Sequence, residues 1–308
     1  MGGGLAYNVL IVGLGNIAML YDYNKESITW THVRALSQDP RFNIISAIDP
    51  NKNNRNKFHE LIKCDVYSDL DTAIHGIDEN IDIFVVSSPT KFHFENYKKI
   101  LKYSQSNDCK MILMEKPLVD TDEELKDLCD NLKFSPMIMV NLFRLYQPQL
   151  NNYLSILSNN KNLDILVTFS KGILHNGIHF FTLLLRYFGE CKSFECFILN
   201  DKKSFRFFFD KGAAIFTPSV LGVDENSLVI KSKIGSLYYL SGGRNSFFID
   251  KDNNKHEFDV EEFNHYQTHV YNEVYEQLIM LKDNNVTDDS FSLAYSAQQW
   301  LSKIEKVI

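Results

Sequence analysis

A short apolar run that is followed at once by two glycines constrains the fold of this chain more than any other feature. Asn8-Val9-Leu10-Ile11-Val12 has the composition of a buried strand, and Gly13-Leu14-Gly15-Asn16-Ile17-Ala18 follows it directly. In a Gly-x-Gly-x-x-Ala turn, the first glycine permits a tight turn, the second lets a ligand approach the backbone, and the small third residue lets the next helix pack on the strand. The N-terminal amides of that helix favour an anion. The pattern therefore predicts a dinucleotide pyrophosphate at Gly13, Leu14, Gly15, Asn16 and Ile17. A glycine turn in another α/β fold is the alternative.

The same alternation of strand and helix continues through the first half of the chain. Four more apolar runs are expected to be strands: 42–48, 81–86, 110–114 and 137–140. Helical stretches separate them at 31–38, 92–103 and 121–132, and the last begins with the capping-box pattern of Thr121 and Glu124. Continuous apolar strands alternating with helices indicate a parallel sheet that is covered on both faces. Residues 1–145 are therefore predicted to form an N-terminal doubly wound Rossmann domain.

The pattern changes after about residue 147. Helices are expected at 149–157 and 176–187 on either side of a strand at 163–169. Strand-like segments then follow one another without helices between them: 194–199, 205–209, 213–216, 228–233, 236–240 and 247–250. Two helices, at about 265–281 and 292–307, end the chain. Residues 146–308 are thus predicted to form a C-terminal α+β domain with a large, mostly antiparallel sheet arranged as a meander. Its aromatic cluster (Phe205, Phe207, Phe208, Phe209, Tyr238 and Tyr239) is expected to be core or interface, so a homodimer or homotetramer through this sheet is plausible.

Composition and charge exclude several classes of protein. The net charge is −7, whereas nucleic acids and anionic membranes attract basic surfaces, so neither is an expected partner. The first residues, Met1–Ala6, lack the basic region and apolar stretch of a signal peptide. The five cysteines are odd in number and no pair has CxxC spacing, which argues against a disulfide framework or a metal site. We therefore expect reduced, mostly buried thiols, no metal and a cytoplasmic location.

Asp49, at the end of the second predicted strand, is the candidate for binding the adenosine ribose hydroxyls. It lies later after the glycines than is usual, and an insertion around residues 21–30 would account for the delay. Its carboxylate would repel a 2′-phosphate, which favours NAD over NADP, although Lys52 and Arg55 nearby leave NADP possible. The alternative role for Asp49 is a turn aspartate before Pro50.

Two further motifs follow strands of the predicted parallel sheet. Ser88-Pro89-Thr90-x-x-His93 follows the third strand, and Glu115-Lys116-Pro117-Leu118 follows the fourth. With the glycine turn, they resemble the TP(N/T)xxH and EKP motifs of the Gfo/Idh/MocA oxidoreductases (glucose–fructose oxidoreductase, inositol dehydrogenase and rhizopine catabolism). The segment from Ser170 to His179 resembles the family's GGxLxDxGxH segment, so that the resemblance extends over the whole chain.

The resemblance implies an NAD(P)-dependent enzyme that transfers hydride between the nicotinamide and a secondary hydroxyl or keto group of a sugar, cyclitol or nucleotide sugar. Lys116 would donate a hydrogen bond to the substrate oxygen, and the bond before Pro117 would be cis. Ser88, Pro89, Thr90, His93, Glu115 and Lys116 would contact the cofactor. His179 would be the acid/base, since imidazole titrates near neutrality. A solvated lysine and a packing histidine are the alternatives.

The chain departs from the family at one position, because His175 stands where the family has an acid. An imidazole cannot support His179 as a carboxylate would, so either His175 shares the proton transfer or His175 and Asn176 bind an unusual substrate. Arg144, which with Asn141 follows the fifth strand, would pair with a substrate carboxylate or phosphate, or with a residue of the other domain. His93 is expected to cap or pack near the cofactor, and no function is assigned to His32. An asparagine- and lysine-rich composition, with Arg144, favours surface-polysaccharide sugar metabolism. A non-catalytic dinucleotide-binding regulator and an enzyme that recycles tightly bound NAD are the other hypotheses.

Overall fold

The structure, a computed structural model, describes residues 6–219, 225–284 and 288–305. The start of the chain, on which the expectation about a signal peptide depends, falls largely outside these residues, as do positions 306 and 307 of the last predicted helix. The described residues divide into two units. The first contains the chain up to Asn141 together with Thr268–Tyr295, and the second contains Leu142–Gln267 and the residues from Ser296 onward. The sequence-based division at residue 145 places Thr268–Tyr295 with the second domain, whereas these residues pack with the first.

The first unit is built on a parallel six-stranded sheet with the order β3-β2-β1-β4-β5-β6. The strands are β1 (Tyr7–Val12), β2 (Phe42–Ile48), β3 (Val66–Tyr67), β4 (Ile83–Val86), β5 (Met111–Met114) and β6 (Met137–Val140). All four residues of β4 and of β5 are buried, as their unbroken apolar sequences require. The order is that of a doubly wound Rossmann sheet, so the predicted fold of this region is confirmed. The two-residue strand β3 was not predicted.

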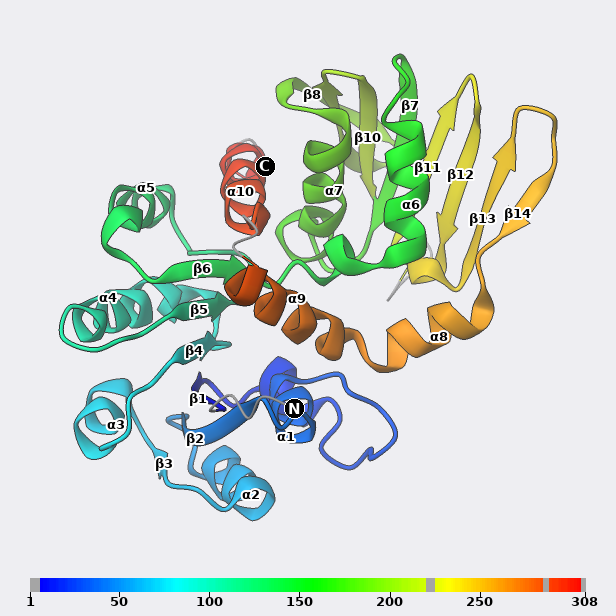
Figure 1. Cartoon of the computed structure of the whole chain (residues 1–308). Helices are drawn as coiled ribbons and strands as arrows, with labels where there is room; N and C mark the ends of the chain where they lie inside the picture. The colour runs from blue at the N-terminus through cyan, green and yellow to red at the C-terminus, as the bar shows by residue number, and fades with distance from the viewer. Residues whose placement is uncertain (1–5, 220–224, 285–287, 306–308) are drawn as a thin grey trace. The chain divides into compact units, whose positions relative to one another are not determined.

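Helices cover this sheet (Figure 1). They are α1 (His32–Gln38), α2 (Lys52–Ile62), α3 (Leu70–Gly76), α4 (His93–Ser104), α5 (Asp122–Asp130) and α9 (Val270–Asn284). The capping box of α5 is present, with Thr121 and Glu124 each bonding to the backbone of the other. The helices α2 and α3 were not predicted. Helix α9 lies beside α1, and Phe42 at the start of β2 packs edge-on against Tyr275 of α9, with ring centroids 5.2 Å apart.

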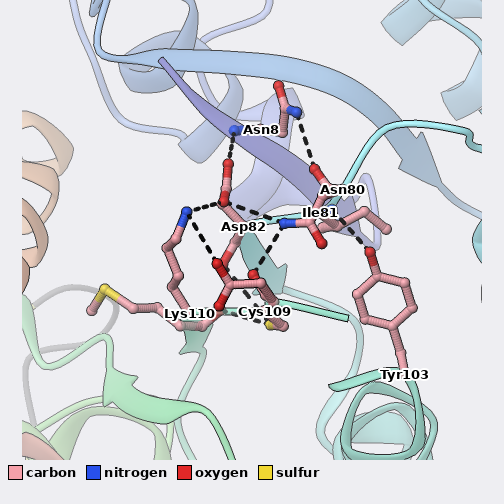
Figure 2. Close-up of polar contacts among 9 residues, drawn as sticks. Asn8, Asn80, Ile81, Asp82, Tyr103, Cys109 and Lys110 are labelled. Carbon is pink, nitrogen blue, oxygen red and sulfur yellow. Dashed lines mark hydrogen bonds and ion pairs between the residues drawn. The ribbon is translucent and has the colours of Figure 1, made fainter. Parts of the chain in front are cut away.

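A polar cluster joins the beginnings of three strands at the amino edge of this sheet (Figure 2). The Asp82 carboxylate accepts a 2.9 Å hydrogen bond from the backbone N–H of Asn8, the second residue of β1, and it forms an ion pair with Lys110 just before β5. The backbone oxygen of Asp82 accepts a 2.8 Å bond from the N–H of Lys110. Burial raises the pKa of the neighbouring Cys109 thiol to about 12, so this thiol stays protonated. The cluster thus fixes the register of β1, β4 and β5 at the edge where parallel strands begin.

Asp82→Asn is expected to destabilise the first unit by about 1–3 kcal/mol, because a largely buried carboxylate that accepts bonds from two strands is replaced by an amide with one acceptor oxygen. Urea unfolding would measure the loss. NAD affinity should stay at the wild-type value, because ligands bind at the opposite, carboxyl edge of a parallel sheet. Wild-type stability in the variant would show that the cluster contributes nothing.

The second unit contains an eight-stranded sheet with the order β14-β13-β12-β11-β7-β10-β9-β8. Its strands are β7 (Leu163–Phe169), β8 (Cys191–Leu199), β9 (Lys202–Phe209), β10 (Gly212–Pro218), β11 (Ser227–Ser232), β12 (Gly235–Leu240), β13 (Asn245–Asp250) and β14 (Lys255–Glu257). All neighbours pair antiparallel except β7 and β10, which are parallel. The prediction of a mostly antiparallel sheet is confirmed. The simple meander is wrong, because β7 lies between β10 and β11 and separates two meanders.

The helices of this unit are α6 (Pro148–Leu157), α7 (Ile178–Phe188) and α8 (Val260–Thr268), with the end of α10 (Ser290–Glu305). Strand β14 and helix α8 were not predicted as separate elements. Helices α6 and α7 cover one face of the sheet (Figure 1). Phe181 of α7 packs against Phe207 of β9 and Phe216 of β10, with ring centroids 4.9 and 5.7 Å apart. Phe205, Phe207, Phe209 and Tyr239 are buried, so these members of the aromatic cluster are core residues.

The cysteines form no disulfide, and all five lie in the part of the chain that the structure describes. Cys191 alone is buried, while Cys196 is exposed, so the expectation that most thiols are buried is wrong. Cys196 is exposed because it lies on β8, an edge strand. Among the described helices, none combines the length and the apolar character that crossing a bilayer requires.

Candidate active site

Three loops meet where adjacent strands of the parallel sheet end. The glycine loop follows β1, the loop with Ser88 and His93 follows β4, and the loop with Glu115 and Lys116 follows β5. Since β1, β4 and β5 are neighbours in the sheet, their carboxyl ends lie at one edge. This edge, where the strand order reverses beside β1, is where open α/β sheets bind ligands.

Gly13 lies directly against the second loop. Its φ is +97°, a conformation that side chains rarely adopt, and a Cβ at this position would lie 2.6 Å from the backbone nitrogen of Ser88. The Ser87 hydroxyl donates a 2.9 Å hydrogen bond to the Gly13 carbonyl. Only glycine therefore lets the first two loops pack together.

Gly15 is required for a different reason. Its φ is −76°, which any residue can adopt, and a Cβ there would meet no atom of the described residues within 4 Å. Neither backbone strain nor protein packing explains a glycine at this position. An open space beside the backbone is what the close approach of a pyrophosphate requires, so the loop fits a dinucleotide.

Asp49 connects the end of β2 to the glycine loop. One carboxylate oxygen, Oδ2, accepts a 2.7 Å hydrogen bond from the N–H of Leu14, and Oδ1 accepts one of 2.7 Å from Asn51. The residue is 6% exposed. Oδ2 also accepts a 3.3 Å hydrogen bond from Nδ2 of Asn54, so that Asp49 orients the loop and its remaining acceptor capacity for a ribose hydroxyl lies on Oδ1.

The helix after the glycines is much shorter than a Rossmann helix usually is. It is a single π-helical turn, Asn16–Leu20, and residues 21–31 separate it from α1. Asp22 organises this insertion, since its carboxylate accepts 2.7 Å hydrogen bonds from the Trp30 N–H and the Thr31 hydroxyl. The insertion that the late position of Asp49 indicated is therefore present. Ala18 is fully buried, in keeping with its packing role, whereas Asn16 is exposed.

His93 links the second loop to the third. One ring nitrogen, Nε2, lies 2.7 Å from the Ser88 carbonyl, and Nδ1 lies 3.0 Å from the Pro117 carbonyl. The ring is 1% exposed. Pro89 and Thr90 lie between these contacts, with Thr90 beginning a 3-10 turn that leads into α4. His93 thus has a packing role at the loops, as expected from the sequence, and holds the third loop beside the first two.

The third loop carries Glu115 and Lys116. The Lys116–Pro117 bond is cis, as the resemblance implied. Lys116 is half-buried, while Glu115 is 7% exposed and its Oε1 lies 3.1 Å from Nε2 of His32. Burial would raise the pKa of the Glu115 carboxyl, but the hydrogen bond from His32 and the charges of His32 and Lys116 outweigh it, and the pKa lies below its ordinary value. Glu115 is therefore a buried carboxylate beside Lys116.

The remaining candidates lie in the second unit. His179, near the start of α7, is 3% exposed, and its ring centroid lies 4.5 Å from that of Phe143. His175 is exposed, and Nδ2 of Asn176 donates a 3.1 Å hydrogen bond to the Ser170 hydroxyl. The segment that resembles the glycine-rich family motif thus places His179 in a buried aromatic environment and His175 at the surface.

Arg144 is a buried cation of the second unit. It is 9% exposed, its guanidinium lies 5.1 Å from the ring centroid of Phe180, and it donates a 2.6 Å hydrogen bond to the Tyr239 hydroxyl. Within the described ranges no acidic side chain forms an ion pair with it, and its Nε has no hydrogen-bond partner. Arg144 therefore retains donor capacity for an anion.

The structure brings together the cofactor-binding candidates of the first unit, from Gly13 to Lys116, and it places His175, Asn176, His179 and Arg144 in the second unit. No group of three or more potential metal ligands occurs among the residues that are described. The sequence reasoning missed His32 and Tyr271, which contact the Glu115 carboxylate, and Tyr275, which contacts His32. Only the expected proximity of α1 to the strand ends could have indicated His32.

Comparison with known proteins agrees with this geometry. Residues 7–141 match the family model GFO_IDH_MocA, described as an oxidoreductase family with an NAD-binding Rossmann fold. No curated protein sequence matches the chain. Many solved structures share its fold.

Three of these structures illustrate the likeness. A dehydrogenase (MviM) from Clostridium difficile is 16% identical, with a TM-score of 0.72 over 98% of this chain and 99% of its own. The WlbA dehydrogenase from Chromobacterium violaceum, in complex with NADH and UDP-GlcNAcA, is 13% identical, with a TM-score of 0.76 over 99% and 94%. An oxidoreductase from Agrobacterium radiobacter, in complex with NAD+, L-tartaric acid and magnesium, is 11% identical, with a TM-score of 0.71 over 94% and 93%. Residues 7–141 of this chain thus match the NAD-binding Rossmann fold of the Gfo/Idh/MocA oxidoreductase family.

Proposed function

We propose that the protein is an NAD-dependent dehydrogenase acting on a secondary hydroxyl, or on the corresponding keto group, of a sugar, cyclitol or nucleotide sugar. The observation that carries this proposal is the linkage of the three loops, since Gly13 packs on Ser88 and His93 joins the Ser88 and Pro117 carbonyls. The linkage holds the loop that carries Lys116 beside the loop of Ser88, which in turn packs on the glycine loop. When bound, NAD supplies the hydride acceptor at nicotinamide C4.

The chain's own residues would bind the substrate and move its proton. Lys116 donates a hydrogen bond to the reacting oxygen and stabilises the negative charge that develops there. The hydroxyl proton is exchanged through His179, whose buried ring suits a single defined geometry. His175, which is exposed, would pass the proton to water in place of the family's carboxylate, and Asn176 would contact the substrate.

A substrate with an anionic group fits the second unit best. Arg144 is a buried guanidinium that retains an unused donor, and burying a cation without an anion is costly. A carboxylate or phosphate of the substrate would compensate it. The ligand of the WlbA dehydrogenase, UDP-GlcNAcA, is a nucleotide sugar with acidic groups, which makes such compounds, and a role in surface-polysaccharide synthesis, the first to test.

The preference for NAD over NADP rests on the end of β2. Asp49 is buried and would repel a 2′-phosphate. Arg55, one of the two nearby cations that left NADP possible, donates 2.7 and 2.9 Å hydrogen bonds to the carbonyls of Asp49 and Pro50 and is thereby engaged. The five unpaired cysteines support action in the reducing cytoplasm.

The test is a panel of nucleotide sugars, free sugars and cyclitols, with NAD and with NADP, followed by NADH absorbance. We expect turnover with NAD, highest for substrates that carry a carboxylate or phosphate. Tight NAD binding by calorimetry with no turnover over the panel, in either direction, would contradict a dehydrogenase.

One observation favours a second candidate function, a non-catalytic regulator that binds NAD. His175 replaces the carboxylate that would support His179, and it lies at the surface. In that case the same ligands would change NAD affinity without producing or consuming NADH. Calorimetric NAD titrations with and without each ligand separate the two functions.

We also propose that the uncovered face of the large sheet pairs with a second copy of the chain. A row of apolar side chains crosses this face on paired positions of adjacent strands: Ile215, Leu166, Val229, Tyr238 and Phe247. Leu166 is 39% exposed although it lies on a central strand. A continuous apolar row on an open sheet face is typical of an interface between subunits.

Leu166→Glu is expected to shift a dimer or tetramer to smaller species in light scattering, because a charge at the centre of an apolar interface is desolvated without a partner. The matched control is Ile156→Glu, on helix α6, where the apolar side chain is 41% exposed. If both variants keep the wild-type mass, the sheet face is not the interface.

A further inference from the structure

A group of five buried polar residues in the first unit is centred on the carboxylate of Glu115. We call His32, Glu115, Asn141, Tyr271 and Tyr275 the Glu115 clamp. None of them is more than 7% exposed. They come from four parts of the chain: the start of α1, the end of β5, the end of β6, and two positions one turn apart on α9.

The contacts converge on a single oxygen atom. Oε1 of Glu115 accepts hydrogen bonds from Nε2 of His32 at 3.1 Å, from Nδ2 of Asn141 at 2.5 Å and from the Tyr271 hydroxyl at 3.3 Å. On the far side of the imidazole, the Tyr275 hydroxyl lies 2.9 Å from Nδ1. Tyr271 also packs edge-on against the His32 ring, with centroids 4.6 Å apart. These contacts fix both the imidazole and the carboxylate.

The convergence indicates that Glu115 is buried as an anion. Three donors on one oxygen stabilise a negative charge. A neutral carboxyl would instead carry a buried O–H that needs an acceptor of its own. The charge of Glu115 raises the pKa of Tyr271 and Tyr275 in addition to the effect of their burial. The one side chain next to Glu115 in sequence that carries a full charge is Lys116, and its charge acts on the pKa of Glu115.

We propose that His32, held by Tyr275, is a positioning residue that fixes the Glu115 carboxylate as the counter-charge of the Lys116 ammonium. The proposal deepens the proposed function, since Lys116 is the residue assigned to the substrate oxygen. Electrostatic coupling is reciprocal, so a carboxylate that is stabilised by the ammonium stabilises the ammonium in turn. His32 would act on the reaction without touching substrate, in the way that outer residues orient metal ligands.

Two substitutions of the same histidine separate this role from simple packing. His32→Gln can place an amide N–H near the position of Nε2 and keep the donor to Glu115, whereas His32→Asn is shorter and keeps only the side towards Tyr275. Both variants remove the ring and its packing on Tyr271. A merely structural histidine would therefore give two variants with similar stability losses and similar activity.

The first readout does not need turnover. Lysine labelled with carbon-13 at Cε gives an NMR signal for each lysine. The Lys116 signal is assigned by its loss in Lys116→Arg, and its pH dependence reports the titration of the ammonium. In Glu115→Gln the pKa of Lys116 should fall by about one unit, since a nearby opposite charge has been removed. His32→Asn should move the Lys116 titration in the same direction, and His32→Gln should leave it near the wild-type position.

The second readout is kinetic. His32→Asn should lower kcat about tenfold, as when a residue that orients a functional group is lost, with the KM for NAD unchanged, while His32→Gln retains most of kcat. Asp82→Asn serves as the stability control, because it weakens the same unit at the opposite edge of the sheet and should not move the Lys116 titration. An unchanged Lys116 titration in His32→Asn and Glu115→Gln overturns the clamp. If the Lys116 titration shifts as expected but the protein turns over no substrate, the proposal for the clamp stands and the dehydrogenase function is refuted.

Discussion

Lys116→Ala is expected to lower kcat by about a hundredfold to a thousandfold, the loss that follows removal of a donor to a developing oxyanion. The chemical reason is that the ammonium offers a charge-assisted hydrogen bond to an oxygen that gains negative charge as its proton leaves. NAD affinity should change by only a few-fold, since the pyrophosphate and ribose sites are proposed to lie at the glycine loop and Asp49. Stopped-flow or steady-state NADH absorbance with the best substrate of the panel measures kcat, and calorimetry measures NAD affinity.

Lys126→Ala is the matched control, because Lys126 is an exposed lysine on α5 of the same unit. It removes one positive charge from the first unit without touching the three loops. Comparable turnover in Lys116→Ala and Lys126→Ala would exclude Lys116 from the reaction. A collapse of NAD affinity in Lys116→Ala would instead assign the lysine to cofactor binding.

Most of the first unit could be predicted from the sequence because its signals are local. An unbroken apolar run of four to seven residues, such as β4 or β5, has to be buried on both faces, and helical segments between such runs leave a parallel sheet as the simple arrangement. Thr121 and Glu124 mark the start of α5 for the same reason, since a capping box is read within four residues.

The parts that could not be predicted depend on contacts between distant segments. The strand β7 reads as the first strand of a meander, yet it pairs in parallel with β10 in the middle of the sheet, and nothing local specifies that partner. The segment Thr268–Tyr295 follows the second unit in sequence and packs with the first. Its anchors, Tyr271 and Tyr275, are ordinary aromatic residues of an amphipathic helix until their buried polar partners are known.

The candidate site shows the same division. Gly13, Asp49, His93 and Lys116 could be predicted as candidates because each lies at or just after the end of a strand. His32 was passed over, since a lone histidine at the start of a helix carries no signal, and Glu115 was assigned to the cofactor although its carboxylate accepts bonds from His32 and Asn141. Motifs therefore indicate the groups that we propose to contact the ligand, whereas the groups that hold them in place emerge only from the packed structure.

Alanine at the two loop glycines is expected to separate folding from cofactor binding. Gly13→Ala should cost about 2–5 kcal/mol of unfolding free energy, because a Cβ at φ +97° is strained and would lie 2.6 Å from the Ser88 backbone nitrogen, which cannot move without shifting β4. Gly15→Ala meets no described atom within 4 Å and has an ordinary φ, so the apoprotein should unfold at the wild-type urea concentration.

The effect on NAD affinity should be in the opposite order to the effect on stability. In Gly15→Ala the added methyl occupies the space beside the backbone where the pyrophosphate would lie, and overpacking of this kind costs ~1–3 kcal/mol, or about a tenfold to hundredfold loss of NAD affinity. If Gly15→Ala keeps the wild-type stability and loses NAD affinity, the glycine is required for binding the ligand and not for folding. Wild-type NAD affinity in Gly15→Ala would mean that the open space at this loop is not where the dinucleotide binds, and it would remove the structural basis for placing the cofactor beside Lys116.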